Sequence, residues 1–341
     1  MLQNTIKASS LLFISLVFCN CSHNRMEVDI ETVSIPQIKF QRLEKDIFLI
    51  TKDNIIAKTV EIKKNYGMFY ERYLSSFINR GGTMDSLYEQ SVLGFVNDKD
   101  MIGVFALIGK TFSDDDTKNL ERQITDGAKR FHYFFPKRKL PIYITTCMSG
   151  FNYSVANSDS TLAIGLDMYL GTDAEFYKML ELPQYRTQTM NKTYIPSDMM
   201  RGWLLNDFDN DAAVNTLVHH TIFYGKLYFA VKALMPEVED SVIIGYTSKQ
   251  MQYCQQNEKN LWGYMAEKNR LYENNMRIVQ ELTGEGPFTS AISKECPPGI
   301  AKWMGWQIVK SYMDKNETVT LEQLMNEKDA QKILSKSKYR P

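Results

Sequence analysis

Residues 140–148 read LPIYITTCM, and this stretch decides the class of fold because it is rich in the β-branched and aromatic residues that strands favour. Two more strand-like segments follow at residues 153–156 and 162–168, and the turn-type cluster NSDS at residues 157–160 joins them. The sequence therefore predicts a small sheet, partly a hairpin, in the middle of the chain.

Helical patterns lie on both sides of this sheet. The clearest covers residues 113–135, where apolar residues recur at helical spacing between an acidic first turn and Pro136. Residues 35–42 are strand-like, whereas residues 183–210 are polar, contain two prolines and are expected to be irregular. Further helices are expected over residues 43–50, 53–64, 69–78, 86–109, 173–182, 212–235 (capped by Asp211), 248–272 (capped by Thr247), 300–313 and a last short one after the capping box Thr320-x-x-Gln323.

The composition is that of a folded protein. The chain has 341 residues, of which 44% are hydrophobic, and no clean linker divides it. We predict an α+β fold: a single, mostly helical domain with a small sheet, spanning residues 35–341. The 40 basic and 40 acidic residues balance, so the chain lacks the basic excess that is typical of a nucleic-acid-binding protein.

The N-terminus is typical of an exported protein. Residues 1–20 combine Lys7 with a short apolar stretch at residues 11–18, as signal peptides do. Cys21 follows and resembles the lipidated cysteine of a bacterial lipobox, with a polar tether over residues 21–34. Cys19 is an alternative lipidation site, and a plain cleaved signal peptide is an alternative to lipidation. No later segment has the ~18 uninterrupted apolar residues of a membrane span.

Three cysteines remain after the leader, namely Cys147, Cys254 and Cys296. None lies in a CxxC pair, which argues against zinc-ribbon and thioredoxin-like sites. Buried apolar thiols are the simpler prediction, and a Cys254–Cys296 bridge is the alternative.

Five short blocks in order suggest a known family. They are IGLDMYLG at residues 164–171, HHTIFYGK at 219–226, IGYT at 244–247, PGIAKWMGWQIV at 298–309 and SKY at 337–339. Together they resemble the gliding-motility lipoprotein GldB family of Bacteroidetes-type bacteria, from about residue 36 to the C-terminus, and the leader agrees.

This resemblance implies a lipid-anchored protein of the cell envelope, at the outer membrane and facing the periplasm, with a role in gliding motility. Family members also occur in bacteria that do not glide. The family is in turn distantly similar to zincin-type metalloproteases, in which a small sheet precedes a helix with the motif HExxH. The resemblance thus implies a zincin-like scaffold.

The motif itself is incomplete here. HExxH places two histidines on one helix face to bind zinc and a glutamate beside them as general base. In this chain His219 takes the first ligand position, His220 replaces the glutamate and Phe223 replaces the second histidine. We therefore predict no metal site, no cofactor and no catalytic residue.

The same region still suggests a polar cleft. His220 and Tyr224 lie one helical turn apart, His219 lies on the neighbouring line, and Asp167 follows an apolar strand from which it could face them. These four residues form the predicted cleft. The alternative is structural: buried polar side chains of this kind also satisfy one another within a core.

We therefore predict a non-catalytic, envelope-anchored lipoprotein with a degenerate zincin-like domain. It would act through envelope protein partners in gliding motility or a related process, with its lipid anchor in the membrane. The alternatives are a metal-dependent peptidase with an atypical ligand set, and a module that binds a peptide or a small molecule.

Overall fold

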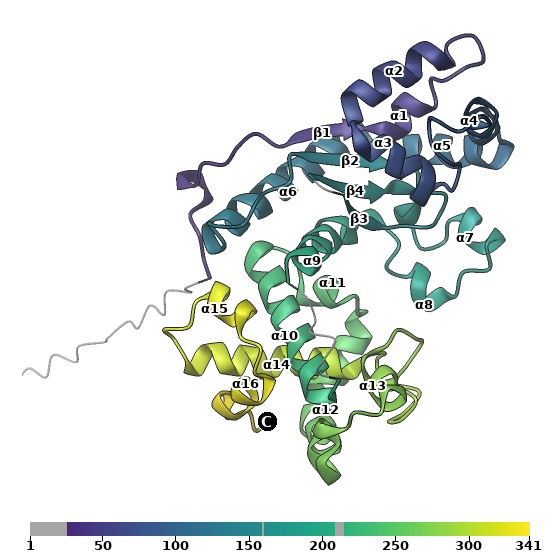
Figure 1. Ribbon diagram of the computed structural model, residues 1–341. Coiled ribbons are helices and arrows are strands. Elements are labelled where there is room, and N and C mark those ends of the chain that lie inside the picture. Colours follow the sequence, from purple (N-terminus) through teal and green to yellow (C-terminus); the bar gives the residue numbers. More distant parts are fainter. Residues whose placement is uncertain (1–25, 159, 209–214) are drawn as a thin grey trace, which may run out of the picture.

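The computed structural model describes residues 26–158, 160–208 and 215–341. These residues form a mostly helical α+β fold with one four-stranded sheet, as the sequence predicts (Figure 1). The predicted signal peptide, Cys21 and Asp211 lie outside the described residues. No helix in the described part is long and apolar enough to cross a membrane.

The described residues contain helices before and after the strands of the sheet. In order they are η1 (Ile30–Thr32), β1 (Lys39–Arg42), α1 (Leu43–Ile47), α2 (Ile55–Tyr66), α3 (Met68–Arg72), η2 (Tyr73–Phe77), α4 (Tyr88–Val96), α5 (Lys99–Thr111), α6 (Asp114–Phe134), β2 (Tyr143–Cys147), β3 (Val155–Ser158), β4 (Thr161–Gly165), η3 (Leu166–Tyr169), α7 (Glu175–Met179), α8 (Gln184–Thr187), η4 (Lys192–Tyr194), α9 (Ile195–Asp207), α10 (Leu217–Leu234), α11 (Asp240–Ile244), α12 (Ser248–Ala266), η5 (Glu267–Tyr272), α13 (Met276–Thr283), α14 (Ile300–Lys315), α15 (Leu321–Asn326) and α16 (Ala330–Ser337).

The sheet has the strand order β1-β2-β4-β3. The pairs β1–β2 and β2–β4 are parallel, and β3 is antiparallel to β4. All of β4 and most of β2 are buried. The stretch LPIYITTCM contains β2, so the strand that its β-branched and aromatic residues predict is confirmed.

Two helical parts flank a central helix, α9 (Figure 1). The sheet, α1–α6 and α7 lie on one side of it, and α10 with the C-terminal helices lies on the other. Trp203 of α9 stacks on Phe131 of α6, with ring centroids 4.2 Å apart, so α9 is fixed against the longest helix. That helix begins at the predicted place, because Ser113 and Asp116 form a capping box.

The prediction of irregular structure over residues 183–210 is wrong. This segment contains α8, η4 and the 13-residue helix α9. Pro183 is the N-cap of α8, and Pro196 occupies the first turn of α9. Proline costs no hydrogen bond in the first turn, because the N–H groups there have no partner within the helix. Both prolines therefore begin helices.

Three other predicted helices have different ends. The helix expected from residue 212 begins at Leu217, with the extended residue Thr216 as its N-cap. The stretch 86–109 contains two helices, because the side chain of Asp98 caps the second of them, α5. The helix expected over residues 248–272 ends at Ala266, and the 3-10 helix η5 follows.

The cap predicted at Thr247 and the capping box predicted at Thr320 are confirmed, and Thr247 also forms a capping box, with Gln250. The three described cysteines, Cys147, Cys254 and Cys296, are buried free thiols, as the simpler prediction has it. Burial raises the pKa of each thiol, that of Cys296 to about 11. A raised pKa keeps a thiol protonated and unreactive.

Candidate functional site

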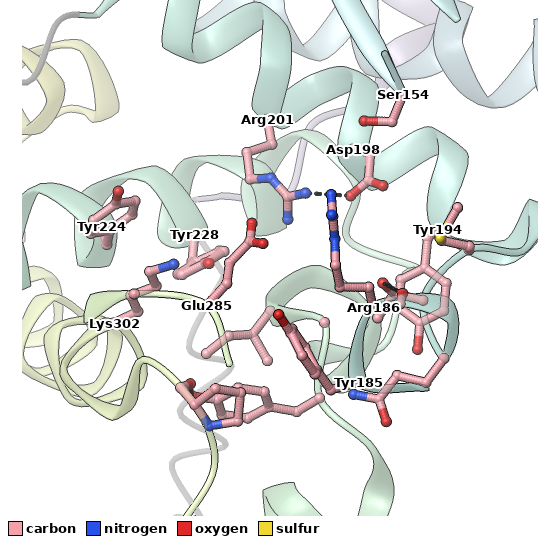
Figure 2. Close-up of a pocket in the computed structure, with 18 of the residues that line it drawn as sticks. Ser154, Tyr185, Arg186, Tyr194, Asp198, Arg201, Tyr224, Tyr228, Glu285 and Lys302 are labelled. Atoms are coloured by element: carbon pink, nitrogen blue, oxygen red, sulfur yellow. Dashed lines mark hydrogen bonds and ion pairs between the residues drawn. The ribbon is translucent and has the colours of Figure 1, made fainter. Parts of the chain in front are cut away.

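A cavity of about 380 Å³ opens between α9, α10 and the segment that leads into α14 (Figure 2). This volume is within the range of small-molecule pockets. Its polar lining comes from seven elements or loops and includes Ser154, Tyr185, Arg186, Tyr194, Asp198, Arg201, Tyr224, Tyr228, Glu285 and Lys302. We call it the tyrosine cavity, because six tyrosines line it: Tyr169, Tyr185, Tyr194, Tyr224, Tyr228 and Tyr246.

Asp198 and Arg201 form the best-defined pair of the cavity. They are three residues apart on α9, so they lie on the same helix face, and Arg201 Nη2 is 2.6 Å from Asp198 Oδ1. The hydroxyl of Tyr169, from η3, donates to Asp198 Oδ2 at 2.9 Å. Burial raises the pKa of Asp198, although Arg201 opposes this shift. Both oxygens of Asp198 are therefore engaged, and the carboxylate holds Arg201 in place.

Lys302 faces Arg201 across the cavity. It lies in the first turn of α14, and its Nζ is 4.7 Å from the centroid of the Tyr224 ring. Burial and the positive charge of Arg201 lower the pKa of Lys302 to about 8, whereas Glu285 opposes the shift. Figure 2 shows the carboxylate of Glu285 directed toward Arg201. No ion pair within 4 Å joins Glu285 to a cation among the described residues.

The tyrosines supply hydroxyl groups that stay protonated. Burial raises the pKa of Tyr224, and it raises that of Tyr228 to about 12. The hydroxyl of Tyr246 donates to the carbonyl of Pro298 at 2.7 Å, which ties the start of α12 to the segment before α14. The cavity thus combines cations with neutral donors and aromatic rings.

The four residues of the predicted cleft do not line one cavity, although the ring centroids of His219 and His220 are 5.8 Å apart. Tyr224 lines the tyrosine cavity, whereas His219 lines a different cavity of about 220 Å³ together with Lys226. His220 is partly buried, and burial lowers its pKa. Asp167 is fully buried and accepts hydrogen bonds from the backbone N–H groups of Ser149 (2.8 Å) and Phe151 (2.6 Å).

Sequence reasoning missed most of the tyrosine cavity. Asp198 and Arg201 lie in the segment that is wrongly predicted to be irregular. Their spacing of three residues places them on one face only if the segment is a helix, so the sequence prediction did not bring them together. Arg186 lies in the same segment. Lys302 lies inside the block PGIAKWMGWQIV, where no sequence pattern marks it as a site residue. The available signal was Pro196, which is typical of a helix start and would have placed Asp198 and Arg201 on one face.

Among the described residues, no group of three or more histidine, cysteine, aspartate or glutamate side chains is arranged to hold a metal ion. His219 lies near Lys226, Arg138 and Glu327 in its cavity. In the tyrosine cavity, the described lining contains no histidine and no cysteine.

Comparison with known proteins gives one match. A family model described as "Gliding motility protein GldB" matches residues 23–341. No curated protein matches the chain, and no solved structure does either. The predicted zincin-like scaffold therefore stays a prediction. The family match covers the sheet, the tyrosine cavity and all the C-terminal helices, and on this basis the chain belongs to the gliding motility protein GldB family.

Proposed function

We propose that this protein is an envelope-anchored lipoprotein that acts by binding, without catalysis, in gliding motility or a related envelope process. Membership of the GldB family supports the process. The lipobox-like leader supports a lipid anchor at Cys21, with the domain at the outer membrane and facing the periplasm. Acyl chains would hold the protein there through about 0.8 kcal/mol for each buried methylene.

The observation that carries the binding role is the chemistry of the tyrosine cavity. Its cations and tyrosine hydroxyls can hold a ligand, and Asp198 already uses both oxygens on Arg201 and Tyr169. A hydrolase of the zincin type would instead bring His219 and a second ligand to one centre. Here the position one turn after His219 is Phe223, which has no lone pair to offer a metal.

Metal content and peptide cleavage test the absence of catalysis. The full-length lipoprotein, purified in detergent and supplied with zinc, is assayed against a peptide library beside the His219→Ala variant. We expect no stoichiometric zinc and no cleavage by either protein. Stoichiometric zinc together with hydrolysis that depends on His219 would contradict the proposal and favour the peptidase.

Membrane fractionation tests the anchor. Cys21→Ala is expected to move the protein to the soluble fraction, and Cys19→Ala is the matched control that should stay on the membrane. In a gliding host, the wild type but not Cys21→Ala should restore movement to a deletion strain. Membrane retention of Cys21→Ala would refute the assignment of the anchor to this cysteine.

A further inference from the structure

We propose that the tyrosine cavity binds a small molecule that carries a carboxylate or phosphate group, and that Arg201, Lys302 and Arg186 recognise this oxyanion. The inference rests on the proposed function, because it names the class of ligand for a protein that acts by binding. Three cations from α8, α9 and α14 face one cavity, although α14 is far from α8 and α9 in the sequence (Figure 2).

Arg201 is positioned in advance. Its described hydrogen bond uses Nη2 on Asp198, and a guanidinium has five N–H donors, so donors remain for a ligand. Asp198 is fixed in turn by the hydroxyl of Tyr169. An arginine that a neighbour holds in place loses little side-chain entropy when it binds, and its planar fork matches the geometry of carboxylate and phosphate oxygens.

The surroundings of Lys302 disfavour its positive charge, so a bound anion would stabilise it. Lys302 is half-buried, and the like charge of Arg201 and the loss of hydration both disfavour its ammonium form. An oxyanion between the two cations would relieve both effects, because an opposite charge within about 4–6 Å favours the charged form of a group. Lys302 also lies in the first turn of α14, where the positive end of the helix dipole adds to the attraction.

Glu285 is the acidic group that competes with such a ligand. It is exposed at the mouth of the cavity, on the loop that follows α13, and its charge is felt by Arg201 and Lys302. Its carboxylate forms no ion pair within 4 Å with either cation, so neither cation is neutralised by direct contact with it. Removing this charge should therefore strengthen the binding of an oxyanion.

The rest of the cavity indicates a ligand larger than a bare ion. About 380 Å³ is more space than one phosphate needs, and the remaining wall includes the six tyrosines together with aliphatic side chains such as Leu205, Leu227 and Ile244. Tyrosine offers an apolar face and a hydroxyl at its tip. A sugar phosphate or an acidic sugar has matching hydroxyls, ring faces and one oxyanion, so it is a suitable probe.

The test is calorimetric titration of the full-length lipoprotein in detergent with glucose 6-phosphate, glucuronate, inorganic phosphate and glucose. We expect saturable binding of at least one of the two sugar acids, weaker binding of inorganic phosphate, and no binding of glucose. Lys302→Gln and Arg201→Gln should each weaken binding about tenfold or more, and Glu285→Gln should strengthen it. Lys259→Gln, which makes the same charge change on an exposed part of α12, should have no effect.

The inference is overturned if none of the three anions binds at millimolar concentration, if glucose binds as tightly as glucose 6-phosphate, or if Lys302→Gln and Glu285→Gln bind as the wild type does. A melting curve of each variant shows whether a loss of binding is a loss of folding, and Glu285→Gln stays informative because it should increase affinity. Zinc-dependent hydrolysis would contradict the proposed function, whereas a failure to bind anions without hydrolysis would contradict only this inference.

Discussion

Gly225 of α10 and Gly305 of α14 face each other at the crossing of these two helices. A Cβ atom on Gly305 would lie 1.8 Å from the carbonyl oxygen of Thr221, and one on Gly225 would lie 2.2 Å from the carbonyl oxygen of Gly305. No Cβ atom tolerates such distances to backbone. The two backbones are therefore in contact, and this contact fixes the helix that bears Tyr224 against the helix that bears Lys302.

The first prediction concerns this crossing. Gly305→Ala must push α14 away from α10, because the clash is with backbone that has no rotamer to change. We expect the free energy of unfolding to fall by about 3 kcal/mol, the upper end for overpacking. Urea unfolding followed by circular dichroism measures it.

Gly263→Ala is the matched control. Gly263 lies inside α12 with open space around its Cα, so alanine there should stabilise the protein by about 0.5–1 kcal/mol through helix propensity. If Gly305→Ala and Gly263→Ala changed the free energy of unfolding equally, α10 and α14 could move apart without loss of stability, and the prediction would be wrong.

The fold follows from the sequence where a local signal acts alone. Gly305 is an example: a glycine costs about 1 kcal/mol within an apolar helix, so the sequence predicts that another element approaches it closely. The structure confirms this close approach. It also shows that the approaching backbone is that of α10 around Gly225, which no local sequence pattern could predict. Strand order is also absent from local patterns, because it depends on pairing between β1 and β2, which are about a hundred residues apart.

The candidate site is less predictable for the same reason. Tyr224 could be predicted because it lies one helical turn after His220 on a strongly apolar helix, and it does line the tyrosine cavity. Arg186, Arg201 and Lys302 are single charges in segments that fold onto one another, and each alone looks like a surface residue. Their convergence depends on where α8, α9 and α14 pack, and tertiary packing decides that.

The second prediction concerns Asp167, whose burial raises its pKa to about 6 even though backbone N–H groups of Ser149 and Phe151 favour its charged form. In the unfolded chain the carboxyl titrates near its ordinary value of about 3.9. Between about pH 4 and about pH 6 the folded state binds more protons, so stability contributed by this group is present at low pH and is lost as the pH rises through 6.

Asp167→Asn should remove this pH dependence. It should also cost about 1–3 kcal/mol near neutral pH, since an amide nitrogen then faces a backbone N–H that needs an acceptor. Urea unfolding at a series of pH values from about 4 to about 7 gives both quantities. Asp173→Asn is the control on an exposed aspartate and should change neither. An unchanged slope in Asp167→Asn would assign the titration to another group.

The third prediction concerns Lys226, which is buried on α10 and donates to the carbonyl oxygens of Met325 (3.2 Å) and Glu327 (2.7 Å). These carbonyls end α15, where helices lack donors of their own. Lys226→Met keeps most of the unbranched apolar side chain but removes the donors. We expect a loss of about 1–3 kcal/mol in the free energy of unfolding. Lys336→Met, an exposed lysine of α16, should be nearly neutral, and a similar loss there would mean that charge rather than the carbonyl contacts is responsible.

The last prediction is the pH dependence of anion binding at Lys302. With a pKa of about 8 in the free protein, this lysine loses its charge as the pH rises. Of the groups that face it, Arg201 and Tyr224 have raised pKa values and stay protonated in this range, and a sugar phosphate is already a dianion because its second pKa is about 6. The affinity for glucose 6-phosphate should therefore fall about tenfold between about pH 7 and about pH 9, as the protonated fraction falls. Lys302→Arg keeps its charge throughout and should bind with nearly constant affinity across the same titrations. If Lys302→Arg shows the same decline as the wild type, another group governs the titration and Lys302 is not the cation that holds the oxyanion.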